Sequence, residues 1–257
     1  MASNESWKAI FNSYNINEHD FNESPYEITS RQIKDATQHF TETNQKEVRI
    51  LCKQDSRNDR PNIFIENELF LLPKKNGIYY IIKGEGYVDI PLITTEPIEY
   101  NSQLDFCLET SLVGNSEMQH LDFAYASSLI RTFMNDTSLV LTIRGRKFTP
   151  EFNFNVNGFQ INTKSVQTEV DAGYEGREQV VLVEAKNSVS TNTIIRQLFY
   201  PYKQWSNYTN KDLKCIFFEK QDNLYNIWEF VFDDVNDYNS IRLSRSARYN
   251  IICLDNE

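Results

Sequence analysis

The sequence predicts a mixed α/β (α+β) protein in which helices flank a central mixed β-sheet, preceded by a smaller N-terminal unit. From residue 116 onward, helix-like and strand-like segments follow in the order α-β-β-β-α-β-β, which is typical of a sheet covered by helices. Apolar residues make up 40% of the 257 residues, enough for a sizeable core. No apolar run approaches the roughly 20 residues that span a bilayer, and the first residues lack a signal-peptide pattern. We therefore expect no membrane contact.

Cysteine, histidine and charge narrow the classes of function. The cysteines lie far apart in apolar surroundings, which predicts reduced thiols and a cytoplasmic protein. The three histidines are not spaced as metal pairs, so zinc sites and histidine-centred catalysis are disfavoured. The net charge of −10 argues only superficially against a nucleic-acid partner, because a basic cleft can coexist with acidic faces. Solvated surface is the simpler interpretation of any one basic cluster: Arg144, Arg146 and Lys147; Arg242, Arg245 and Arg248; Lys53, Arg57 and Arg60.

Residues 1–100 form the predicted N-terminal α+β unit. Thr29 and Gln32 have the spacing of a capping box at the head of a helix that runs to Phe40. Two strand-like runs, 69–72 and 78–82, are joined by a segment containing Asn76 and Gly77, a strong hairpin signal. Helices followed by a hairpin fit a winged-helix DNA reader and equally an ordinary α+β packing unit, and both interpretations stay open.

Residues 101–257 form the predicted second domain. Ser116 and Gln119 again have capping-box spacing, here at the start of a long helix that reaches Phe133. A second helix is predicted over 193–206, and Pro201 should kink it or end it early. The predicted strands are 139–143, 159–171, 180–183, 213–218 and 227–232.

Glu184, Ala185 and Lys186 end the most strand-like run of the chain. Side chains two apart on a strand share a face, so the carboxylate of Glu184 and the ammonium of Lys186 point the same way. Such a pair suits phosphodiester hydrolysis, in which the carboxylate holds a divalent cation and the lysine acts on the attacking water. The pair is weak evidence alone, because Asp212 and Lys214 match the same pattern.

Asp171 strengthens this signal. A turn near Gly176 would place Asp171 opposite Glu184 on the neighbouring antiparallel strand, close enough for both carboxylates to share a cation. Alternation puts Gln167 and Glu169 on the same face, so Glu169 is a further candidate ligand. A salt-bridged hairpin on a solvated face is the alternative, but such an acidic face repels itself unless a cation compensates.

Asp171, twelve residues and then Glu184-Ala-Lys186 resemble the signature of the PD-(D/E)xK nuclease superfamily, with Val170 in the place of its proline. The α-β-β-β-α-β order over 116–232 matches the restriction-endonuclease-like core of that superfamily. The segments EVDAGYE, VEAK and IRQLFYPY, with 49–55 and the entry to the hairpin at 71–73, resemble a group of bacterial type II restriction endonucleases.

The resemblance implies roles for particular residues. Asp171, Glu184 and the Ala185 carbonyl would bind Mg²⁺, and Lys186 would position the attacking water. Glu117 would complete the metal shell, unless it only favours the start of its helix. Gln197, with Tyr200 or Tyr202, would line the site, although the polar face of an amphipathic helix explains them as simply. Arg196 would contact a phosphate or bridge a carboxylate.

The function expected on this basis is sequence-specific, Mg²⁺-dependent cleavage of double-stranded DNA by a type II restriction endonuclease. A methyltransferase partner is implied, and a homodimer is left open. Another PD-(D/E)xK nuclease, of repair or exonuclease type, and a non-catalytic DNA-binding regulator are the alternatives. The candidate DNA-contacting residues are Arg57, Asn58, Arg60, Arg144, Arg146, Lys147 and Arg196.

Overall fold

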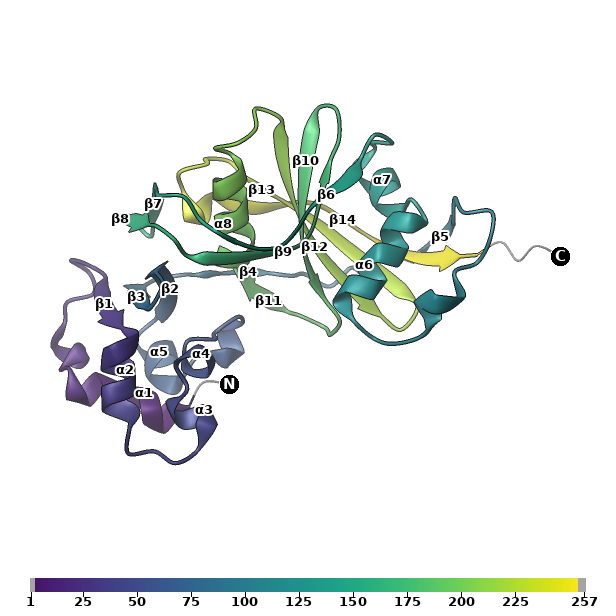
Figure 1. The fold of residues 1–257 in the computed structure, drawn as a ribbon. Helices are drawn as coiled ribbons and strands as arrows, with labels where there is room; N and C mark the ends of the chain where they lie inside the picture. Colours follow the sequence, from purple (N-terminus) through teal and green to yellow (C-terminus); the bar gives the residue numbers. More distant parts are fainter. Residues whose placement is uncertain (1–2, 254–257) are drawn as a thin grey trace.

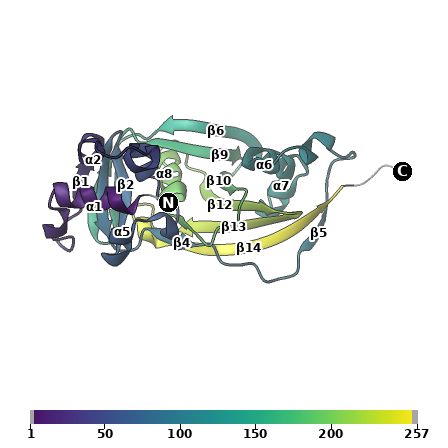
Figure 2. The ribbon, with the colours of Figure 1, turned by 90° about the horizontal axis from the view of Figure 1, so that it is seen from below.

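A computed structural model describes residues 3–253 as two units joined side by side (Figures 1 and 2). The N-terminal unit holds small helices and a three-stranded antiparallel sheet in the order β1-β3-β2. Its helices are α1 (Asn4–Ser13), α2 (Ser30–Thr37), α3 (Thr43–Lys46), α4 (Val48–Leu51) and α5 (Asn62–Glu66). Its strands are β1 (Tyr26–Thr29), β2 (Leu69–Lys75) and β3 (Ile78–Lys83). No helix within 3–253 is long and apolar enough to cross a bilayer.

Two local predictions for this unit are confirmed. The Thr29 side chain and the Gln32 side chain cap each other's backbone at the start of α2. The β2–β3 hairpin turns at Asn76 and Gly77, where Gly77 has φ +76°. The helix α2 stops at Thr37, however, before the predicted Phe40.

The second unit is built on a seven-stranded mixed sheet in the order β5-β14-β13-β12-β10-β9-β6. The pairs β10–β12 and β5–β14 are parallel and the others antiparallel. The strands are β5 (Ile98–Asn101), β6 (Val140–Phe148), β9 (Gln167–Glu175), β10 (Gln179–Lys186), β12 (Asp212–Gln221), β13 (Leu224–Phe232) and β14 (Ile241–Ile252). Two short ribbons pair β4 (Tyr87–Asp89) with β11 (Asn192–Ile194), and β7 (Phe152–Val156) with β8 (Phe159–Thr163).

Helices cover both faces of this sheet. Val181, Val183 and Ala185 of β10 pack with α6 (Glu117–Ala126) and α7 (Leu129–Met134). Val180 and Leu182 point the opposite way, toward side chains of α8 (Arg196–Trp205). The mixed sheet flanked by helices is therefore as predicted, and in the main sheet the order from α6 is α-β-β-β-α-β-β, followed by β14.

Several predicted elements differ from those observed. The long helix from Ser116 breaks into α6 and α7 because Ser128 adopts a left-handed conformation, φ +67°. Its N-cap forms, but the Gln119 side chain binds the carbonyl of Thr110 instead of closing a capping box. The strand predicted over 159–171 is divided into β8 and β9 at Ser165, φ +54°.

Pro201 does not end α8, which continues to Trp205. Phe199 before the proline and Gln204 after it are both buried. Tertiary packing thus holds the two halves of the helix in line despite the missing backbone donor. The helix begins at Arg196, because the preceding residues of the predicted helix pair with β4 as β11.

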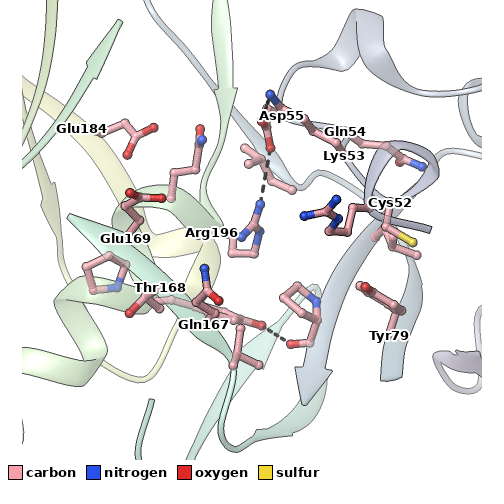
Figure 3. A pocket seen from close by; sticks show the side chains of 18 of the residues that line it. Cys52, Lys53, Gln54, Asp55, Tyr79, Gln167, Thr168, Glu169, Glu184 and Arg196 are labelled. Carbon is pink, nitrogen blue, oxygen red and sulfur yellow. Dashed lines mark hydrogen bonds and ion pairs between the residues drawn. The ribbon is translucent and has the colours of Figure 1, made fainter. Parts of the chain in front are cut away.

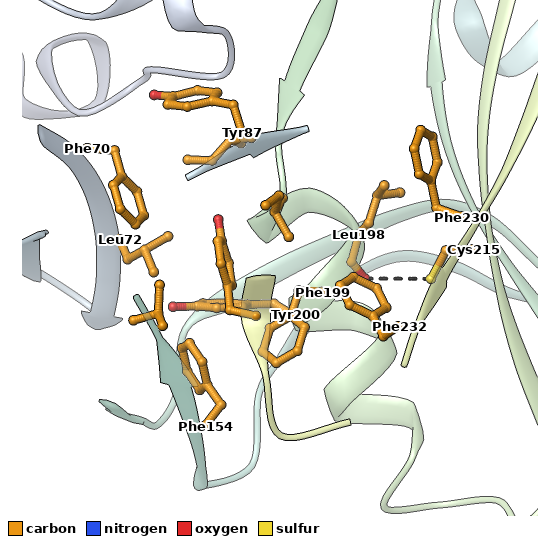
Figure 4. Packing of buried hydrophobic residues seen from close by; sticks show 14 of the residues in the cluster. Phe70, Leu72, Tyr87, Phe154, Leu198, Phe199, Tyr200, Cys215, Phe230 and Phe232 are labelled. Carbon is orange, nitrogen blue, oxygen red and sulfur yellow. Dashed lines mark hydrogen bonds between the residues drawn. The ribbon is translucent and has the colours of Figure 1, made fainter. Parts of the chain in front are cut away.

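One aromatic core joins the two units (Figure 4). Phe70 and Leu72 of the N-terminal sheet pack in the same cluster as Phe154, Phe199 and Tyr238 of the second unit. Strands β4 and β5 pair with β11 and β14, so residues 87–101 belong to the second unit. The boundary predicted at residue 100 therefore moves to the segment after β3.

The turn between β9 and β10 is held in place by Asp136. This carboxylate accepts hydrogen bonds from the Ser138 backbone (2.8 Å), the Ser138 hydroxyl (2.6 Å) and the Gln179 amide (3.0 Å). The Ser138 hydroxyl in turn accepts from the backbone of Arg177 in the turn (3.0 Å). These bonds fix the hairpin that sets the register of β9 against β10.

Asp136→Ala should lower the free energy of unfolding by about 1–2 kcal/mol near neutral pH, because several turn donors lose their acceptor. The hydrogen bond from Ser138, foremost among the causes, lowers the pKa of Asp136 below its ordinary 3.8. The stabilisation is therefore fully present above that value and is lost as the pH falls through the lower, folded-state pKa. Denaturant unfolding of both proteins across the acid range measures the difference.

Asp233→Ala is the control, because Asp233 pairs with Arg242 where both side chains are 59% exposed. It should change the free energy of unfolding by less than about 0.5 kcal/mol. Equal effects of the two substitutions would refute the anchoring role of Asp136.

Candidate active site

A cleft of about 780 Å³ lies between the two units (Figure 3). One wall comes from the N-terminal unit, from the end of α4, the loop after it and the β2–β3 hairpin. The other wall comes from the start of α6, from β9 and β10, and from α8. The side chains central to the site are Glu117, Glu169, Asp171, Glu184, Lys186 and Arg196.

Asp171 and Glu184 face each other across the β9–β10 pair. The observed register runs from Val180 opposite Glu175 to Val183 opposite Ala172, and one further step places Glu184 opposite Asp171. The Ala185 N–H donates to the Asp171 carboxylate at 2.7 Å. Asp171 lies in the middle of β9 and not at its end as predicted, but the predicted turn at Gly176 is present.

Burial raises the pKa of both carboxylates. Glu184 is 8% exposed, and burial raises its pKa from 4.5 to about 7; Lys186 lowers the pKa and Asp171 raises it further. Burial also raises the pKa of Asp171, against the Ala185 N–H and Lys186. The charges of Glu117 and Glu169, which line the same cleft, add to that rise.

Lys186 forms an ion pair with Glu184. Burial lowers the pKa of Lys186, but Glu184, Glu117 and Asp171 together raise it above its ordinary value. The lysine is therefore a cation at neutral pH. Even so, one ammonium stands against the three carboxylates of Glu117, Asp171 and Glu184, which leaves the site short of positive charge.

The donor set fits Mg²⁺. This ion is usually held by one or two carboxylates, retained waters and substrate phosphate oxygens. Asp171 and Glu184 supply two carboxylates, and the Ala185 carbonyl faces the same neighbouring strand as its N–H, which is the side of Asp171. Within residues 3–253, no group of three or more His, Cys, Asp and Glu side chains is arranged to hold a metal ion.

Glu169 reaches the site differently from the prediction. Against β6, the register passes from Gly173 opposite Ile143 to Val170 opposite Gly145, so β9 carries an extra residue beside Asp171. This bulge interrupts the alternation of side chains along β9, on which the prediction that Glu169 shares a face with Asp171 was based. Glu169 still lines the cleft, where it pairs with Arg146 at 3.1 Å.

The predicted supporting residues of α8 have structural partners. Gln197 lines the cleft and accepts a hydrogen bond from Thr193 (2.6 Å). Tyr200 is 1% exposed, and its hydroxyl donates to the Pro73 carbonyl (3.0 Å), which ties α8 to the N-terminal hairpin. Arg196 bridges Asp55 at 3.4 Å across the cleft (Figure 3). This bridge does not test the predicted phosphate contact of Arg196, and Tyr202 packs against the aromatic core.

Most of the predicted DNA-contacting residues lie elsewhere. Among residues 3–253, Arg196 is the one member of that set that lines the cleft. The other cations have partners: Arg57 with Glu85 and Asp89, Arg60 with the Leu69 carbonyl, Arg144 with Asp122, Arg146 with Glu169, and Lys147 with the Trp205 ring. Asn58 is exposed outside the cleft.

Three exposed cations on the N-terminal wall were not among the predicted contacts. Arg49, Lys53 and Lys75 all line the cleft opposite the carboxylates. Arg49 lies on α4 and Lys53 in the loop directly after it. Lys75 comes directly before the Asn76–Gly77 turn and so lies near the hairpin tip. That all three cations face the carboxylates depends on how the two units pack, which local sequence patterns do not predict.

Mg²⁺ should bind more tightly as the pH rises from about 6 to about 8, because a proton competes for Glu184, whose pKa is about 7. Below that pKa the apparent affinity should fall by up to about tenfold per pH unit. Calorimetric titration in buffers of different ionisation enthalpy measures both the affinity and the proton released. Asp171→Asn should weaken binding, whereas Asp212→Asn, in the matching motif outside the cleft, should not. An affinity independent of pH would contradict this role for Glu184.

Comparison with known proteins gives two family matches and no functional description. Residues 4–81 match the model of the domain of unknown function DUF6996, and residues 82–250 match that of the domain of unknown function DUF6997. No curated protein and no solved structure matches the chain. The two models meet between residues 81 and 82, inside β3 and just before the segment where the structure divides into its units. The DUF6997 model covers more than half of the chain, so the chain belongs to the DUF6997 family, and the DUF6996 match precedes it in the sequence.

Proposed function

We propose that this protein is a Mg²⁺-dependent DNA endonuclease of the type II restriction kind. The observation that carries the proposal is the pair of carboxylates formed by the buried Glu184 and the half-buried Asp171, held opposite each other with Lys186 beside them. Buried acidic groups with raised pKa values in a cleft are characteristic of functional sites. The resemblance of Asp171 and Glu184-Ala-Lys186 to the PD-(D/E)xK signature supports the same chemistry.

Hydrolysis of a phosphodiester forms one P–O bond from water and breaks one ester P–O bond, with a proton passing to the leaving oxygen. Asp171, Glu184 and the Ala185 carbonyl would hold Mg²⁺, which supplies Lewis-acid activation of the phosphate and of a bound water. Lys186 carries a positive charge, so it donates hydrogen bonds, orients the water and offsets negative charge on the phosphate. The raised pKa of Lys186 favours this role over that of a proton acceptor.

The N-terminal wall supports a nucleic-acid substrate. Arg49, Lys53 and Lys75 are exposed on the side of the cleft opposite the carboxylates, in position to contact phosphates. The order β1-β3-β2, with helices before the β2–β3 hairpin, favours the winged-helix interpretation of this unit. Double-stranded DNA is thus the proposed partner, and a methyltransferase that protects host DNA belongs to the same proposal.

Asp171→Ala should reduce cleavage of plasmid DNA in Mg²⁺ by about 10³-fold or more while the protein stays folded, because one of two metal-binding carboxylates is lost. Asp212→Ala, the matched change in the motif outside the cleft, should cut at the parent rate. Gel electrophoresis of the products and circular dichroism of the variants test both points. Full activity of Asp171→Ala would refute the assignment.

The products also separate the alternative functions. Discrete fragments support a restriction endonuclease, and progressive loss from the ends indicates an exonuclease. Metal-independent DNA binding without cleavage indicates a regulator.

Replacing Arg49, Lys53 and Lys75 together with Ala should weaken DNA binding and reduce the slope of log affinity against log salt by about two to three, close to one per lost phosphate contact. Binding is measured by fluorescence anisotropy in the Asp171→Ala background, so that the DNA stays intact. The control is Lys8, Arg31 and Lys164 replaced together, which are 58%, 91% and 62% exposed and outside the cleft. Equal slopes for the two triple variants would remove the N-terminal wall from the binding surface.

A further inference from the structure

Phe148 presents an exposed aromatic ring to the cleft. It is the last residue of β6 and is 60% exposed. Among the large hydrophobic residues exposed in 3–253, it is the one that lines the cleft. The others, including Phe106 at 51%, lie outside it. A large apolar ring that is exposed to water in a charged cleft indicates a binding site for a partner with an apolar face.

The backbone that carries this ring is fixed. Thr149, the next residue, is 3% exposed; its N–H donates to the Val166 carbonyl (2.9 Å), and its own carbonyl accepts from Ser165 (3.1 Å). The Phe148 carbonyl accepts from the side-chain amide of Gln204 on α8 (3.4 Å). The exposure of Phe148 is therefore not that of a loose loop, because its strand end is tied to two neighbouring segments.

Register places the ring beside Glu169 on the wall of the cleft. Phe148 lies opposite Gln167, and Arg146 lies opposite Glu169, so Phe148 and Glu169 share one sheet face. Gln167 and Glu169 line the cleft together in Figure 3. Gln167 is four residues from Asp171, at most about 13 Å along the strand. That length corresponds to about four stacked bases.

We propose that Phe148 stacks on a nucleobase of the DNA held in the cleft, a few nucleotides from the phosphate at Asp171 and Glu184. This inference rests on the proposed function. Cations on the opposite wall attract a polyanion, and the aromatic ring adds a surface for a flat π-system. A nucleic acid provides both, because phosphates and base faces alternate along the strand. Apolar side chains also enter between base steps of duplex DNA, so paired and unpaired bases are both within reach.

The test compares Phe148→Ala, Phe148→Trp and the matched control Phe106→Ala, all in the full chain with Asp171→Ala. The probes are a fluorescein-labelled 30-nucleotide single strand of mixed sequence and the corresponding duplex. Phe148→Ala should weaken binding to one or both by about 5- to 150-fold, the range for loss of one stacked base. Phe148→Trp should retain the affinity, and its emission should be quenched as the DNA binds. Phe106→Ala should bind like the parent.

Three results would overturn the inference: parental affinity of Phe148→Ala for both probes, a tryptophan at 148 whose emission is unchanged at saturating DNA, or no DNA binding by the parent. A change in oligomeric state on Phe148→Ala, seen by light scattering, would also overturn it, because the ring would then pack against a second copy of the chain. Plasmid cleavage by the unaltered protein keeps the two proposals apart. If the unaltered protein cleaves plasmid DNA but Phe148→Ala binds DNA like the parent, only the stacking role is refuted. If the tryptophan at 148 is quenched by DNA but no cleavage occurs, only the nuclease activity is refuted.

Discussion

The close approach of two carboxylates, Asp171 and Glu184, on neighbouring antiparallel strands is the constraint around which the second unit is organised. Glu184 is buried and Asp171 half-buried, and the charge of Asp171 raises the free energy of ionising Glu184. Lys186 and the Ala185 N–H offset part of that repulsion. The negative charge that remains favours the binding of a cation. A divalent cation bound here would lie where the proposed phosphate chemistry needs it.

The rest of the fold keeps this arrangement in place. The hairpin register depends on the turn that Asp136 and Ser138 anchor, and apolar residues of β10 fix the strand between α6 and α7 on one face and α8 on the other. The aromatic core around Phe199 and Tyr238 joins the N-terminal sheet to the same scaffold. The cleft is consequently bounded by two walls that share a core, so its width and the separation of its charges are set before any ligand arrives.

The sequence predicted the features that depend on residues close together in the chain, and it did not predict those that depend on distant residues. The β9–β10 hairpin and the pairing of Asp171 with Glu184 were predictable, because strand alternation and a glycine turn act within about fifteen residues. The helix break at Ser128 and the continuation through Pro201 were not, since packing of distant segments overrides local propensity there. The bulge that displaces Glu169 depends on pairing with β6, more than twenty residues away. The cationic wall depends on the docking of two units, which pattern and spacing do not contain.

Charge separation across the cleft has a thermodynamic consequence for a nucleic-acid substrate. The chain carries a net charge of −10, and its carboxylate cluster alone would repel a phosphate brought against it. On the proposed function, a divalent cation at Asp171 and Glu184 would offset much of that repulsion, whereas Arg49, Lys53 and Lys75 would attract phosphates with or without it. The proposed metal and DNA would therefore favour each other's binding, and by linkage the coupling would be equal in both directions. Protonation of Glu184 would be the competing event, since it would remove charge that recruits the proposed metal and with it part of the proposed affinity for DNA.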